Sequence, residues 1–90
     1  MAITGGGAAI FPTIMTSKCI YTDNQDVIAA TITATYTGDI AWYLSADNGG
    51  HWEAATPGVR LVFFNQGSYL RWRVVMNSGS EISYMEVLYE

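Results

Sequence analysis

The chain has 90 residues, of which 50% are hydrophobic and 13% are aromatic. Charged residues make up only 13%, against about 25% in an ordinary globular domain, and the formal net charge is −4. This composition predicts one folded domain. It excludes intrinsic disorder, which needs low hydrophobicity and high charge, and it excludes an electrostatic nucleic-acid binder, which needs a basic face.

The first twenty residues differ in character from the rest of the chain. Three consecutive glycines, Gly5 to Gly7, precede an apolar segment that ends at Pro12. Because glycine and proline both interrupt regular structure, residues 1–20 are predicted to form an extended N-terminal arm. The apolar side chains of this arm are candidate partner-binding residues: Ile3, Ile10, Phe11, Ile14 and Met15. The alternative for the second half of the arm is a first strand of the domain, from Ile14 to Tyr21.

From residue 21 onward the sequence is typical of short strands separated by turns. A polar turn is predicted at residues 23–26, and residues 28–37 then alternate between an apolar face and a threonine-rich face. Further strands are predicted at residues 40–45, 51–55, 60–64, 69–76 and 82–89. Turn residues between them predict reversals at residues 37–39, 47–50, 56–58, 65–67 and 77–80. The fold class is therefore predicted to be all-β, as a small antiparallel β-sandwich, jelly-roll-like, over residues 21–90.

The predicted strand at residues 69–76 has two different faces. Four apolar side chains alternate on one face and are assigned to the core: Leu70, Trp72, Val74 and Met76. Arg71 and Arg73 lie on the opposite face. They are either candidate binders of an acidic partner or ordinary solvated side chains.

Residues 45–52 match the Asp-box pattern S-x-D-x-G-x-x-W through four residues: Ser45, Asp47, Gly49 and Trp52. The aspartate of such a hairpin accepts backbone N–H bonds, the glycine supplies a backbone conformation that other residues resist, and the tryptophan covers the turn. Asp boxes are familiar from sialidases and other glycan-handling proteins, where the box is a structural hairpin away from the active site. The four residues are therefore predicted to be structural, with carbohydrate binding as the alternative.

Nothing in the sequence predicts a catalytic, cofactor or metal site. Cys19 and His51 are the only residues of their types, so an intrachain disulfide and a Cys or His metal cluster are not expected. No serine lies in a nucleophile elbow, and the carboxylates show no arrangement typical of a glycosidase, so the chain is expected not to be an enzyme. No signal peptide and no apolar stretch of about 20 residues is present, so no membrane partner is expected.

The order of motifs after residue 27 carries a family resemblance. Residues 40–53 read IAWYLSADNGGHWE and are followed by Phe63-Phe64, Gln66-Gly67, the segment YLRWR at residues 69–73, and a last strand at residues 82–89. This order resembles a β-sandwich domain of bacteriophage virion proteins, found in tail, fibre and minor structural proteins. The chain departs from that pattern at residues 47–50, which read DNGG where the family often has DGG.

The resemblance implies a non-enzymatic structural subunit of the virion that is made in the host cytoplasm. Since the domain stands almost alone, it is expected to be a capsid decoration or cement protein, or a tail accessory protein. Its expected partners are other capsid or tail proteins and further copies of itself in a homo-oligomer or multi-copy assembly. The alternative is a carbohydrate-binding β-sandwich module for cell-surface attachment, with a glycan as partner.

Overall fold

The computed structural model describes residues 13–17 and 21–90, and these residues form six strands without a helix. The strands are β1 (Thr13–Thr16), β2 (Tyr21–Thr37), β3 (Ile40–Ser45), β4 (Glu53–Ala55), β5 (Leu61–Met76) and β6 (Glu81–Tyr89). All the strand pairs are antiparallel. The predicted all-β antiparallel class is therefore confirmed, while the finer jelly-roll-like sandwich stays a prediction.

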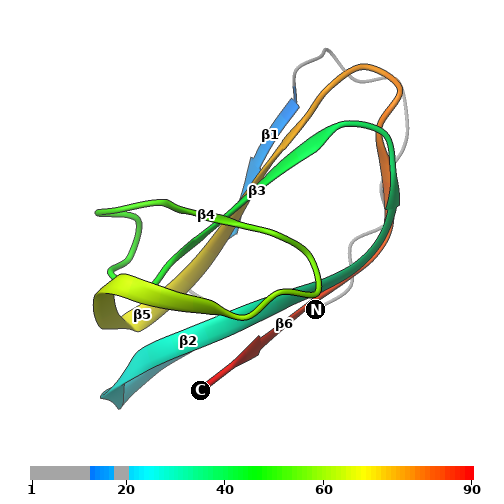
Figure 1. Cartoon of the computed structure of the whole chain (residues 1–90). Helices are drawn as coiled ribbons and strands as arrows, with labels where there is room; N and C mark the ends of the chain where they lie inside the picture. The colour runs from blue at the N-terminus through cyan, green and yellow to red at the C-terminus, as the bar shows by residue number, and fades with distance from the viewer. Residues whose placement is uncertain (1–12, 18–20) are drawn as a thin grey trace.

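The central strand is β5, which has 16 residues and pairs with different strands along its length. Its first part pairs with β2, which pairs in turn with β6. Its last part pairs with β3, and β4 continues the sheet beyond β3. The strand order is therefore β4-β3-β5-β2-β6, with β1 attached to β5 (Figure 1).

Two predicted turns are wrong, because the residues concerned lie inside long strands. Residues 65–67 continue β5, and residues 23–26 lie within β2. At the second position the ladder is irregular: Thr22 pairs with Tyr69 and Val27 with Gly67, so four residues of β2 face a single residue of β5. Turn-forming residues are used here to shift the register of a strand rather than to reverse the chain.

The core is one cluster to which β2, β3, β5 and β6 all contribute. The predicted inward face of β5 is confirmed, since all four of its apolar residues are buried. The predicted apolar face of β2 is buried only in its middle, at Ala30 and Ile32, whereas Ile28 and Tyr36 are exposed. A register shift between Val27 and Ala29 breaks the alternation at Ile28. Tyr36 is 40% exposed, but its ring still contacts that of the buried Trp42. The cluster consists of Val27, Ala30, Ile32, Trp42, Leu44, Ala46, Phe63, Leu70, Trp72, Val74, Met76, Ile82 and Met85.

Part of the predicted arm lies on the domain's own sheet. Residues 13–16 pair with residues 73–76 of β5, and the Ser17 N–H donates to the Trp72 carbonyl at 2.9 Å. Met15 packs against the core, and Ile14 is exposed. For residues 13–16 the structure therefore has a strand rather than a free arm, with other bounds than the alternative from Ile14 to Tyr21, because Tyr21 begins β2. The other three arm candidates, Ile3, Ile10 and Phe11, lie outside the described residues.

Candidate functional site

The Asp-box hairpin connects β3 to β4 and has the backbone that its residue types allow. Asn48 and Gly49 have φ angles of 60° and 87°, in the left-handed region that asparagine and glycine tolerate best. The predicted turn at residues 47–50 therefore occurs in the structure. The strand that follows begins at Glu53 rather than at the predicted residue 51.

Ser45 and Asp47 hold this hairpin together by hydrogen bonds within the chain. The Ser45 hydroxyl is buried, donates to Asp47 Oδ1 at 2.7 Å and accepts the Gly49 N–H at 2.9 Å. Asp47 Oδ1 also accepts the backbone N–H of His51 at 2.8 Å, and Asp47 Oδ2 lies 2.5 Å from His51 Nδ1. The carboxylate thus closes the turn at both of its oxygens.

These bonds set the charge state of Asp47. Partial burial by itself raises the pKa of this carboxyl, but hydrogen bonds from the His51 ring, the Ser45 hydroxyl and the His51 N–H outweigh that effect. Together they lower the pKa of Asp47 from 3.8 to about 2. Because the folded state binds this proton more weakly than the unfolded state does, the bonds stabilise the fold above about pH 4.

We expect Asp47→Ala to lower the free energy of unfolding by about 1–2 kcal/mol near pH 7, because the hairpin loses its central acceptor. In the unaltered chain the contribution of Asp47 should fall away between about pH 4 and pH 2, as the carboxyl takes up its proton. Urea titrations at several pH values measure both effects. Asp47→Asn is the matched control, since it keeps an acceptor oxygen but should not show that pH dependence. An unchanged urea midpoint for Asp47→Ala would contradict the structural role.

The arginines predicted as partner-binding residues contact this same hairpin. The guanidinium carbon of Arg73 lies 4.2 Å from the centroid of the Trp52 ring, and that of Arg71 lies 5.8 Å from it. Arg71 also donates to the carbonyls of Ser17 at 2.9 Å and Asn48 at 3.2 Å. The two arginines thus connect Trp52 and the turn to Ser17, the residue that follows β1. The sequence did not indicate these contacts, because the residues involved lie far apart along the chain. Their role in binding a partner stays a prediction.

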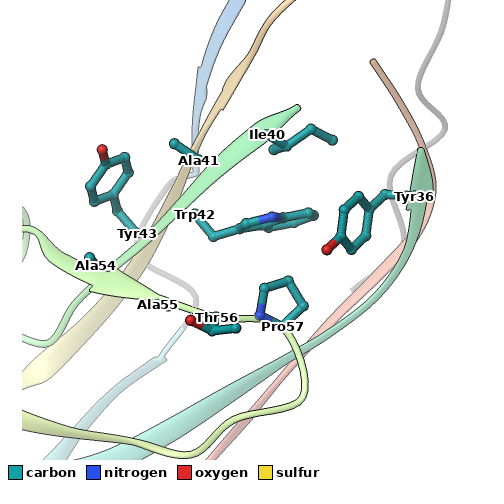
Figure 2. Close-up of a pocket in the computed structure, with 9 residues that line it drawn as sticks. All are labelled: Tyr36, Ile40, Ala41, Trp42, Tyr43, Ala54, Ala55, Thr56 and Pro57. Atoms are coloured by element: carbon teal, nitrogen blue, oxygen red, sulfur yellow. The ribbon is translucent and has the colours of Figure 1, made fainter. Parts of the chain in front are cut away.

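An open pocket of about 310 Å³ lies where β4 ends beside β3. Figure 2 shows the Trp42 indole at its centre, with Tyr36 at one end and Pro57 below. The Tyr36 and Trp42 rings meet edge to face, with centroids 5.0 Å apart. The lining contains no Asp, Glu, Lys, Arg or His and consists of Tyr36, Ile40, Ala41, Trp42, Tyr43, Ala54, Ala55, Thr56 and Pro57.

Sequence reasoning also missed a protruding phenylalanine. Phe63 is 3% exposed and belongs to the core, whereas Phe64 is 94% exposed. The Glu53 carboxylate accepts the backbone N–H groups of Phe64 at 2.9 Å and Asn65 at 3.1 Å, which fixes the backbone at this point. The period-two alternation of a strand was the available signal, because neighbouring residues of a strand point to opposite faces.

Comparison of the chain with protein-family models, with curated proteins and with solved structures returned no match. Within residues 13–17 and 21–90, no group of three or more His, Cys, Asp and Glu side chains is placed to hold a metal ion. The same residues include no helix long and apolar enough to cross a membrane.

Proposed function

We propose that this chain is a non-enzymatic structural subunit of a bacteriophage virion, namely a capsid decoration or cement protein or a tail accessory protein that binds neighbouring coat proteins. The observation that carries the proposal is the apolar surface. Among the described residues, ten large hydrophobic side chains are exposed, and Phe64 stands out at 94%. Burial of an apolar side chain of this size against another protein stabilises the complex by about 1.5–3 kcal/mol.

The polar groups of the most specific motif support a structural role as well. Ser45, Asp47 and the two arginines each bond to other parts of the same domain. Such bonds stabilise a hairpin and join it to β1.

The carbohydrate-binding alternative has less support. The tryptophans of the core offer no open ring face for sugar stacking, since Trp42 is 4% exposed and Trp72 is 6% exposed. The Trp52 ring is already covered by arginine. We therefore expect no binding above background on a glycan array. Saturable binding of one sugar class, lost on Tyr36→Ala, would favour the alternative instead.

Association with virus particles tests the main proposal. Particles from the source phage are purified on a density gradient, washed in high salt, and analysed by quantitative mass spectrometry. We expect the protein in the particle band in many copies, retained after the wash because apolar contacts are not screened by salt. Recovery only in the soluble fraction of the lysate would overturn the proposal.

A further inference from the structure

We propose that Arg71 and Arg73 form a binding site for carboxylates on the outer face of β5, and that an acidic segment of the neighbouring coat protein occupies it. The inference rests on the proposed function, since it names the chemistry by which the neighbour meets this chain. Its basis is that two arginines are held beside one tryptophan ring, and that neither is paired with a carboxylate in the described part of the chain.

Both arginines lie on the side of the sheet that faces away from the core. The residues that alternate with them along β5 are buried, so Arg71 and Arg73 point to the opposite side. An exposed apolar side chain shares this outer face. Ile14 of β1 pairs directly with Val75, two residues after Arg73, and directly paired residues point to the same face. Ile14 is 62% exposed, so the face offers an apolar contact next to two cations.

The guanidinium groups are fixed in place by their own chain. Arg71 donates to two backbone carbonyls, through Nε at 2.9 Å and through Nη1 at 3.2 Å. Arg73 Nε donates to the Thr16 hydroxyl at 3.1 Å, and its guanidinium carbon lies 4.2 Å from the centroid of the Trp52 ring. Binding therefore costs less side-chain entropy than it would for unrestrained arginines. The Nη groups of Arg73 donate to no other described residue, so they can hold a carboxylate bidentately.

The positive charge at this site is not balanced within the described residues. There, arginine meets a carboxylate in one ion pair, between Arg60 and Glu90 at 2.8 Å. Arg71 and Arg73 contact carbonyls, a hydroxyl and an aromatic ring instead. The whole chain has a net charge of −4, so these two residues make a local positive site on an acidic molecule. A carboxylate of another protein is the group that complements it.

The size and charge of the site favour an acidic protein segment over a nucleic acid. Two cations can bind one or two carboxylates, whereas a phosphate backbone is bound by many basic residues and is repelled by the negative charge of this chain. Charged groups at an interface mainly raise the association rate and orient the partners. The arginines therefore orient the neighbour, while apolar side chains such as Ile14 keep it bound.

An NMR titration of the isotope-labelled protein with a synthetic oligoglutamate peptide, up to about 5 mM, tests the site. We expect the Nε–H signals of Arg71 and Arg73 and the indole signal of Trp52 to shift. The shifts should decrease as salt rises from about 50 mM to about 500 mM, because exposed charges are screened. Unmoved arginine signals at the highest peptide concentration would overturn the inference.

Substitutions show whether the planar guanidinium is what binds. Arg73→Gln should weaken peptide binding about fivefold or more, and Arg73→Lys should weaken it less, because lysine keeps the charge but loses the bidentate geometry. Arg60→Gln is the matched control, since Arg60 is already paired within its own chain, and it should leave binding unchanged. Circular dichroism melts verify that each variant is folded. Equal binding by Arg73→Gln and the unaltered chain would also overturn the inference.

Other ligands test the identity of the occupant. Inorganic phosphate, or an oligonucleotide of equal charge, that shifts the arginine signals as strongly as the peptide does would overturn an acidic protein segment as the occupant. Self-association of the chain that is lost in Arg73→Gln would make a second copy the occupant and would overturn the neighbouring protein in that role.

Binding to particles separates this inference from the proposed function. At low salt, Arg73→Gln should bind to particles stripped of this protein about fivefold or more slowly than the unaltered chain does. Equal association of the two chains would overturn the inference and leave the proposed function in place. A chain that binds the peptide but is absent from purified particles would overturn the proposed function, and with it the coat protein as the source of the acidic segment.

Discussion

Replacing Phe63 with alanine is expected to lower the free energy of unfolding by about 3–5 kcal/mol, whereas the same replacement at Phe64 should change it by less than about 0.5 kcal/mol. The two residues are neighbours of one type in one strand, so they differ only in environment. Phe63 belongs to the core and is 3% exposed, and Phe64 is 94% exposed. Urea unfolding at a concentration where monomers predominate measures both values.

The size of this difference follows from the size of the domain. A small domain is stable by about 5–15 kcal/mol, so removing one core aromatic ring takes away a large part of that stability. Phe63→Leu is a useful intermediate, since it keeps much of the apolar volume and should cost less than the alanine variant. Equal losses at positions 63 and 64 would show that the two faces of this strand are assigned wrongly.

The strand pattern and the hairpin were predictable because both depend on local sequence. The alternation from Leu70 to Met76 gave the correct buried face, since side chains of a strand alternate by geometry alone. The Asp box also needs only eight consecutive residues, and its hydrogen bonds connect residues no more than four positions apart.

The two wrong turn predictions have the opposite cause, because these segments depend on contacts with residues that are distant in the sequence. Residues 23–26 and 65–67 contain residue types that are common in turns, yet they lie in long strands. The same residue types also occur where a strand is irregular, or where another segment of the backbone packs closely against it. Whether such residues form a turn or an irregular part of a strand depends on the groups that contact that segment in the folded chain. At residues 64 and 65 that group is the carboxylate of Glu53, eleven and twelve positions away.

The pocket was beyond prediction for the same reason. Tyr36 comes from the end of β2, Trp42 from β3, and Pro57 from the loop after β4, so the pocket exists only once the register of three strands is fixed. The two arginines near Trp52 illustrate this too. Alternation placed them outside the core, but their contacts with Ser17 and Asn48 depend on how distant segments meet.

Gly67 lies at one of these close approaches. A Cβ atom added to it would lie 2.4 Å from the Ala46 carbonyl oxygen and 3.3 Å from the Asp47 Cα. Both atoms belong to backbone, and this backbone is held in place. The Tyr69 N–H donates to the Ala46 carbonyl at 3.2 Å, and the Asn48 N–H donates to the Tyr69 carbonyl at 3.0 Å. Unlike a flexible side chain, these groups have no other conformation to adopt.

We therefore expect Gly67→Ala to destabilise the fold by about 1–3 kcal/mol, and Gly67→Val to destabilise it further, because a larger side chain forces β5 away from the Asp-box hairpin. Urea unfolding measures the total loss. Hydrogen exchange at the Tyr69 and Asn48 amides should show where it arises, through faster exchange at these two sites than in β6. Gln66→Ala, a change at an exposed neighbouring position, is the matched control and should have little effect. A Gly67→Ala chain as stable as the unaltered one would mean that β5 and Ala46 lie farther apart than this structure has them.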